Sequence, residues 1–303
     1  MASLKPLVGL LYNPAVPAVL DAAGALVDHV EVIPDRLWYD FGLGEPRRFS
    51  HAHTAIAELR RYAERHRVIG HGIGLSLPSA MPIDEALLDE VAASHRHFGY
   101  QWYSEHLSMF LAPGGSVPNA QAGMGLPVVH GEELLDIVTE KLALMDQALG
   151  GVPLALENGT IFSAIPDPEM SEPEFLNRLY ARTGCKMLLD LHNLYANTRN
   201  LGWSADEYLA ALDPEIVLEV HIAGGDMLRG HYTDSHSRRT PDAVWEWLAA
   251  WGPRFPNLAA ITFEYHESYH KRIGLAGVIA ELEAMQQAAE AIAGSRTLVR
   301  EAA

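Results

Sequence analysis

Short apolar runs alternate along this chain with segments in which apolar residues recur at helical spacing. The apolar runs predict strands buried on both faces, near residues 6–12, 29–34, 67–74, 101–106, 152–157, 185–190, 216–222 and 258–264. Helical patterns lie between them, near residues 15–27, 51–66, 83–98, 131–149, 171–183, 204–212, 240–252 and 274–293. This alternation is typical of an α/β fold, and about eight repeats favour a closed (β/α)8 TIM barrel over an open sheet.

The whole chain is expected to form one domain. We predict a single TIM barrel over residues 1–303, with a core of about 6–293 and a short Ala-rich C-terminal tail that frays after 285. Ser171 and Ser204 each precede acidic residues, so they predict capped helix starts. No stretch of the sequence has the roughly 18–20 apolar residues that a membrane helix needs.

Two predicted connections are long, residues 35–50 and 107–130. Both follow strands and would rise from the C-terminal face of a barrel, where long connections are usually functional. They carry the apolar residues Trp38, Tyr39, Phe41, Met109, Phe110 and Met124. These side chains predict an apolar rim suited to a peptide or organic substrate, or else they pack the connections onto the barrel.

Charge and cysteine content narrow the class of protein. The formal net charge is −17, from 22 basic and 39 acidic residues, which argues against a nucleic-acid-binding surface. The single cysteine, Cys185, forms no intramolecular disulfide and fits a reducing cytoplasm. It begins an apolar run, so we interpret it as a small buried residue rather than a reactive thiol.

Histidines and carboxylates stand at the ends of six predicted strands. They are His71, His106, Glu157, Asp190, His221 and Glu264. In a barrel, the C-terminal ends of the strands converge on one mouth. Almost no Lys or Arg lies beside them, and burying carboxylates without a cation is costly, so bound metal is the economical partner. We therefore expect these six residues to be metal ligands and to form the catalytic site.

The donor set is too rich for one ion. It contains nitrogen and oxygen but no thiolate, which suits Fe, Mn or Zn. Glu157 and Asp190 follow adjacent strands and could bridge two ions. Asp234 and His236 lie in one loop, and with Asn193 they could complete a third site. His192 is the competing ligand, with a hydrogen-bonded supporting role as the alternative.

An ordered series of motifs carries a resemblance over about residues 6–285. The strings are HGIGLSL, SEHLS, ENG, LLDLHNLY, VHIAGG, TDSHS followed by Trp245, and FEYH. Together they resemble the multinuclear non-haem iron-dependent oxidases, such as the methanobactin-biosynthesis oxidase, which are xylose isomerase-like TIM barrels with a metal layout similar to endonuclease IV.

The resemblance implies both a ligand set and an activity. One iron would be held by His71, His106 and Glu157, a second by Glu157, Asp190, His221 and Glu264, and a third by Asn193, Asp234 and His236. His266, which follows the FEY of the last motif, departs from the pattern and would be a competing ligand. The family uses two or three irons, of mixed Fe(II)/Fe(III) state, and O2 as co-substrate to oxidise a Cys, Asp or Asn of a ribosomally made precursor peptide. A small leader-binding partner protein commonly assists.

Three other functions remain open. A Zn-dependent phosphodiesterase similar to endonuclease IV could use the same layout, although the negative charge opposes a DNA substrate. A metal-dependent sugar isomerase or epimerase needs fewer histidines and usually a lysine near the metal, whereas Lys186 starts its predicted strand. A non-enzymatic metal store would not need two long connections over the mouth.

Overall fold

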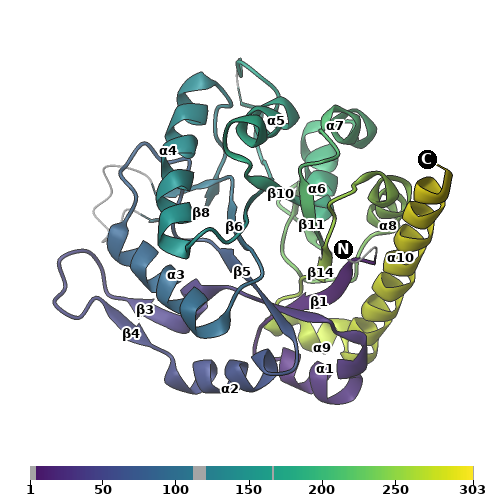
Figure 1. The fold of residues 1–303 in the computed structure, drawn as a ribbon, viewed down its shortest axis with the longest axis horizontal. Coiled ribbons are helices and arrows are strands. Elements are labelled where there is room, and N and C mark those ends of the chain that lie inside the picture. The colour runs from purple at the N-terminus through teal and green to yellow at the C-terminus, as the bar shows by residue number, and fades with distance from the viewer. Residues whose placement is uncertain (1–4, 112–120, 166, 303) are drawn as a thin grey trace. The chain divides into compact units, whose positions relative to one another are not determined.

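The computed structural model of this chain describes residues 5–111, 121–165 and 167–302. Its long parallel strands pair in the order of a closed barrel, β1-β14-β11-β10-β9-β6-β5-β2 (Figure 1). Their bounds are β1 Leu7–Leu11, β2 His29–Val32, β5 Arg67–Gly72, β6 Tyr103–His106, β9 Leu154–Glu157, β10 Lys186–Asp190, β11 Val217–Ile222 and β14 Ala260–Phe263. The predicted (β/α)8 fold class is confirmed.

Two compact units can be distinguished within the chain. The first comprises Met1–Glu31, Thr160–Ala164 and Lys186–Ala303, and the second comprises Val32–Gly159 and Ile165–Cys185. The expectation of a single domain over 1–303 stays a prediction, and each unit is described by itself.

The first unit contains the barrel strands β1, β14, β11 and β10 and all of β2 except Val32. Strand β14 pairs with β1 on one side and with β11 on the other, and β11 pairs with β10, all in parallel register. Its helices are α1 Val16–Ala23, α6 Leu191–Leu201, α7 Ala205–Ala211, α8 Asp242–Trp251, α9 His270–Ile273 and α10 Leu275–Ala302. A short hairpin, β12 Asp226–Leu228 and β13 His231–Thr233, follows β11. The strands are almost wholly buried, as their apolar sequences predict.

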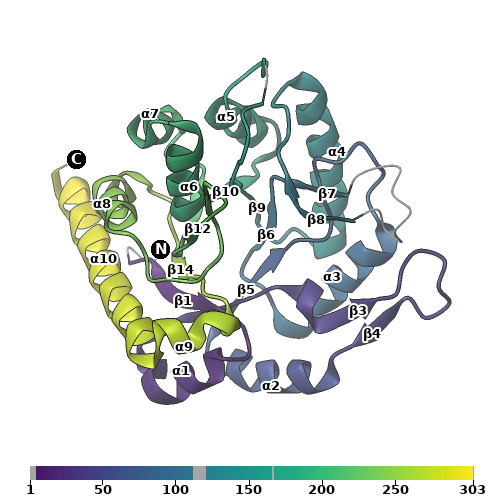
Figure 2. The same ribbon diagram turned by 180° about the vertical axis from the view of Figure 1, so that it is seen from behind.

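The second unit contains strands β5, β6 and β9, which pair in that order and in parallel. Its helices are α2 His53–Ala63, α3 Glu85–Phe98, α4 Glu132–Leu149 and α5 Glu172–Thr183 (Figure 2). The predicted cap at Ser171 is confirmed, because its hydroxyl accepts a hydrogen bond from the Glu174 N–H at the start of α5. In the first unit, Ser204 caps α7 in the same way.

Two helical features differ from the sequence prediction. Helix α6 was not expected: it begins directly after β10, where Asp190 accepts the backbone N–H of His192 and of Asn193. The Ala-rich segment after residue 285 is helical, because α10 continues to Ala302, and the fraying of its end stays a prediction. It presents buried apolar residues from Val278 to Ile292, and Arg296 donates to backbone carbonyls at Phe255 and Leu258.

Both long connections contain hairpins within the second unit. Residues 35–50 form β3 Trp38–Asp40 and β4 Phe49–His51, while β7 Met109–Leu111 pairs with β8 Gln121–Leu126. Trp38 is buried, whereas Tyr39 and Phe41 are 68% and 60% exposed; Met109 and Phe110 are half-buried. Residues 112–120 and the side chain of Met124 lie outside the described part. Of the apolar residues predicted to form a rim, Trp38 is therefore packed inside, whereas Tyr39 and Phe41 are on the surface.

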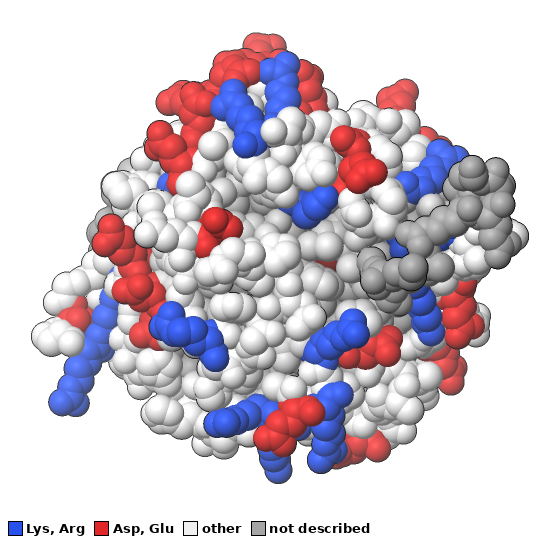
Figure 3. Space-filling view, in the orientation of Figure 1, with Lys and Arg blue, Asp and Glu red and all other residues white. Residues whose placement is uncertain are grey.

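Acidic and basic side chains are interspersed on the face shown in Figure 3. Ion pairs between α4 and α5 illustrate how such charges combine: Arg178 lies 2.6 Å from Glu132, and Arg182 lies 2.5 Å from Asp136. Among the described helices, none is both long enough and apolar enough to cross a membrane.

Candidate metal centre

His71, His106 and Glu157 form one group in the second unit. Each residue ends or nearly ends its strand, β5, β6 or β9, and the ligand atoms that they offer lie within 4.8 Å of one another. Oε2 of Glu157 is 3.4 Å from Nε2 of His71 and 3.1 Å from Nε2 of His106. Two imidazole nitrogens thus face one carboxylate, which is an N/O donor set suited to a divalent transition metal.

Hydrogen bonds orient both imidazoles of this group. Nδ1 of His106 lies 3.0 Å from the carbonyl oxygen of Gly72, which can only accept, so Nδ1 donates. The Ser104 hydroxyl donates to the carbonyl of Gly70, so it accepts from Nδ1 of His71 at 2.8 Å. In the neutral tautomers set by these bonds, Nε2 of each ring carries the lone pair that a metal requires.

Glycines let strand β5 carry His71 in this position. A Cβ at Gly70 would lie 2.6 Å from the Tyr100 ring, and one at Gly72 would lie 1.9 Å from the Tyr103 hydroxyl. Successive strand residues point to opposite faces. The two glycines therefore make room for tyrosines on one face while His71 projects from the other.

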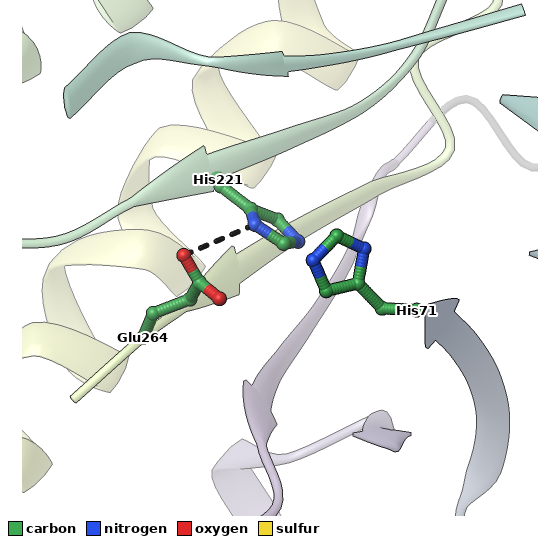
Figure 4. A group of neighbouring side chains, drawn as sticks. All are labelled: His71, His221 and Glu264. Atoms are coloured by element: carbon green, nitrogen blue, oxygen red, sulfur yellow. Dashed lines mark ion pairs between the residues drawn. The ribbon is translucent and has the colours of Figure 1, made fainter. Parts of the chain in front are cut away.

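Asp190, His221 and Glu264 form a second group, in the first unit. Asp190 ends β10, His221 lies near the end of β11, and Glu264 follows β14; the ligand atoms that they offer lie within 4.8 Å of one another. Nδ1 of His221 is 3.2 Å from Oε2 of Glu264 (Figure 4). All three residues are buried. Asp190 is additionally held by α6, since its Oδ1 accepts the two N–H groups at the helix start.

The loop after β13 adds two further candidates in the same unit. Nε2 of His236 lies 2.9 Å from Oδ1 of Asp234 and 3.4 Å from Oε2 of Glu264. His236 has a positive φ of 50°, an uncommon backbone conformation for a residue with a side chain. Asn193, in the first turn of α6, accepts a hydrogen bond at Oδ1 from the Thr160 hydroxyl. The predicted third set is thus spread over α6 and this loop.

The two competing histidines have other partners. His192 is fully buried, with Nδ1 2.9 Å from Oδ1 of Asp234 and Nε2 3.3 Å from the Tyr232 hydroxyl. Both of its ring nitrogens contact protein groups, which fits the supporting role. Nδ1 of His266 accepts the Ser268 N–H, and its side chain is 39% exposed.

Sequence reasoning missed two carboxylates beside His221. Glu31 on β2 and Glu219 on β11 are both completely buried in the first unit. Burial raises the pKa of Glu31 to about 8, although His221 opposes this shift. A signal was present: Glu219 precedes His221 by two residues, so both project from the same face of one strand. An acidic residue inside an apolar run indicates a buried polar network.

Charges within the first unit set the protonation of the metal-free residues. Burial opposes the positive charge of both imidazoles, but Glu31 and Glu264 raise the pKa of His221 well above its ordinary value. Asp234 and Glu264 likewise raise the pKa of His236 from 6.5 to about 10. Burial also disfavours charge on Glu264, yet His221 and His236 lower its pKa to about 2. Metal binding at these residues must therefore displace protons.

Comparison with known proteins gives a family match over nearly the whole chain. The model of the family described as RiPP precursor modification enzyme MbnB/TglH/ChrH matches residues 8–290. A UPF0276 protein of Caulobacter vibrioides (strain NA1000 / CB15N) is 33% identical over 262 residues, covering 86% of this chain and 88% of that protein. A UPF0276 protein of Chromobacterium violaceum is 38% identical over 205 residues, covering 66% of this chain and 72% of that protein.

Solved structures share the fold. A xylose isomerase domain containing protein of Salmonella typhimurium LT2 has a TM-score of 0.57 and 10% identity, covering 96% of this chain and 99% of its own. Endonuclease IV of Thermus thermophilus has a TM-score of 0.52 and 17% identity, with coverages of 94% and 99%. The E. coli 3-keto-D-glucoside 4-epimerase YcjR has a TM-score of 0.54 and 13% identity, and the match covers 91% of this chain and 99% of that chain. At these identities the likeness is one of fold, and it confirms the xylose isomerase-like barrel.

The stability of the metal-free protein should fall as pH rises through the range set by His236. Folding raises the pKa of His236 from 6.5 to about 10. The protonated ring therefore contributes its full share to the free energy of unfolding below about pH 6.5, and this contribution is lost as the pH rises towards 10. His236→Asn should make stability depend less on pH over this range, because Asn tolerates the positive φ but has no titrating ring. Thermal unfolding in chelator across pH 6–10 measures the effect.

His130→Asn is the matched control for this measurement. His130 is also buried, but burial lowers its pKa to about 4, so its loss should leave the slope between pH 6.5 and 10 unchanged. Parallel profiles for the wild type and His236→Asn would show that His236 is not charged in the folded, metal-free protein.

Proposed function

Because the chain belongs to the MbnB/TglH/ChrH family of RiPP precursor modification enzymes, we propose that it is a multinuclear non-haem iron oxidase. It uses O2 to modify a Cys, Asp or Asn residue of a ribosomally synthesised precursor peptide. The observation that carries this proposal is the pair of buried N/O ligand groups, one in each unit. The choice of iron follows the motif resemblance and agrees with this donor chemistry.

Each ion is assigned to residues that the fold already orients. His71, His106 and Glu157 hold one iron, and Asp190, His221 and Glu264 hold a second. Asn193, Asp234 and His236 hold a third, more loosely, because an amide oxygen is a weaker ligand than an imidazole and two of these residues lie in a loop. Sharing of Glu157 between the first two ions stays a prediction.

The protein and the metal divide the chemistry. Bound iron supplies the redox capacity that an oxidation by O2 requires. The chain supplies fixed ligands, since the Nδ1 atoms of His71 and His106 are already engaged by Ser104 and the carbonyl of Gly72. It also excludes water from part of the proposed ligand set, because Asp190 and His221 are completely buried and Glu157 is 2% exposed.

Iron loading should be necessary for peptide modification. Protein prepared without oxygen should contain two or more irons per chain, and with O2 it should change the mass of a precursor peptide encoded beside its gene. Mass spectrometry of the peptide measures this, with Zn(II)-loaded protein as the control because zinc has no redox activity. Equal activity of the zinc form, or hydrolysis of a phosphodiester by it, would move the function to the phosphodiesterase class.

Removing a ligand should remove metal as well as activity. Glu157→Ala and Asp190→Ala should each lose at least one ion, and Glu157→Ala should lose two if this carboxylate is shared. Elemental analysis of the purified variants gives the ion counts. Asp190 also caps α6, and losing a cap costs about 1 kcal/mol of stability.

Ser204→Ala is the matched control for that loss. It removes the cap of α7 without touching any proposed ligand, so its metal content should equal that of the wild type. A full complement of metal in folded Glu157→Ala or Asp190→Ala would contradict the ligand assignment at that position.

A small leader-binding protein should raise turnover strongly. The β3–β4 hairpin exposes Tyr39, Phe41 and Leu43, which together provide an apolar surface for a partner or leader. Phe41→Ser should reduce the gain in turnover that the partner gives. Leu298 is also apolar and is 68% exposed, but it lies on α10, so Leu298→Ser should leave this gain unchanged. Peptide conversion is measured with and without the neighbouring gene product. Efficient turnover of a free small molecule without any partner would exclude the peptide-modifying form of the proposal.

A further inference from the structure

Two completely buried glutamates, Glu31 and Glu219, stand next to His221 in the first unit, and neither belongs to the proposed ligand set. A buried carboxylate is costly unless hydrogen bonds or charges compensate for it. The contacts of both residues must therefore compensate for the cost of burying them.

The two glutamates contact His221 differently. Nε2 of His221 lies 3.1 Å from Oε1 and 3.0 Å from Oε2 of Glu31, within hydrogen-bond distance of both oxygens. Oε1 of Glu219 lies 3.8 Å from the same Nε2, which is too long for a hydrogen bond. On the other side of the ring, Nδ1 lies 3.2 Å from Oε2 of Glu264. The two nitrogens of His221 thus face two different carboxylates.

This arrangement determines which nitrogen is available for a metal. We infer that Glu31 is a positioning residue: its carboxylate accepts the Nε2–H of His221, so that Nδ1 is the nitrogen that binds the ion. The inference rests on the proposed function, in which His221 and Glu264 hold one iron. A carboxylate behind a metal-bound histidine fixes the tautomer and the ring orientation, and it makes the ligating nitrogen more basic.

Glu219 is directed elsewhere by a chain of hydrogen bonds. The Thr262 hydroxyl donates to Oε1 of Glu219 at 2.5 Å, so with its single proton used it accepts from Nε2 of His29 at 2.8 Å. Gly9 makes this possible, because a Cβ there would lie 2.6 Å from the His29 ring. Glu219 is thus oriented by Thr262, and Glu31 is the carboxylate that contacts His221.

The histidines of the second unit follow the same principle with weaker acceptors. Nδ1 of His71 donates to the Ser104 hydroxyl, and Nδ1 of His106 donates to the carbonyl of Gly72. Each ring is held through the nitrogen that does not face Glu157. Glu31 gives His221 a carboxyl oxygen as acceptor in the corresponding role, on Nε2 instead of Nδ1.

The experiment compares metal affinities of three glutamine variants. Fe(II) affinity is measured anaerobically by competition with a chromophoric chelator, and Co(II) absorption reports the ligand geometry. Glu31→Gln should lower the affinity for one Fe(II) ion by about 10- to 100-fold, which is the usual effect of losing such a partner. It should also alter the Co(II) absorption spectrum. Glu219→Gln should have a smaller effect because Oε1 of Glu219 is 3.8 Å from Nε2 of His221 and is engaged by the Thr262 hydroxyl. Glu172→Gln, beside buried His130 in the second unit, is the control and should change neither quantity.

Saturating metal separates positioning from ligation. If Glu31 positions His221, Glu31→Gln regains the full ion count when Fe(II) is raised, whereas Glu264→Gln, which loses a direct ligand, does not. A permanent loss of one ion from Glu31→Gln would mean that Glu31, Glu219 and His221 themselves bind a metal, and it would overturn the inference. So would unchanged affinity and spectrum in a folded Glu31→Gln. Failure of the wild type to bind Fe(II) or Co(II) would instead refute the proposed function.

Discussion

The pairing of buried carboxylates with imidazoles is the interaction on which this structure depends. Each unit places acidic side chains at positions almost free of solvent, where an isolated negative charge is unfavourable. In the second unit Glu157 faces two histidines, and in the first Glu264 faces His221 and His236. In the first unit of the metal-free chain, where the pKa values of His221 and His236 are raised, these imidazoles provide the compensating charge. The same atoms would form the proposed ligand set, and a metal that binds there would displace the protons.

Main-chain groups of a strand and of a helix orient two of the candidate ligands. The carbonyl of Gly72 holds His106, and the backbone of α6 holds Asp190. Such partners are built into the main chain and cannot be removed by a side-chain substitution. Where the backbone offers no acceptor, a side chain takes its place, as Ser104 does for His71 and Glu31 does for His221. Geometry of this kind would hold the candidate ligands in place before an ion binds.

Much of the fold and of the candidate site could be predicted from local patterns. The eight barrel strands were found because each is a short apolar run, and the ligand candidates because a polar residue ends such a run. Helix α6 was missed because it follows β10 without an intervening loop, so its start gives no separate signal. The hairpins within residues 35–50 and 107–130 were missed because three of their four strands have only three residues, fewer than any barrel strand. In the last turns of α10, Arg296 donates to the carbonyl oxygens of Phe255 and Leu258, which lie far away in sequence.

The sequence by itself determined the fold class, the family and the residues that could bind metal, because these follow from periodicity and from the order of motifs along the chain. Tertiary structure alone decided which nitrogen of each histidine is engaged, which of two neighbouring glutamates contacts His221, and why His192 is occupied by Asp234 and Tyr232. Each of these depends on distances of about 3 Å between residues that lie far apart in sequence. No local pattern encodes such distances, since they arise only when separate strands and loops are packed together.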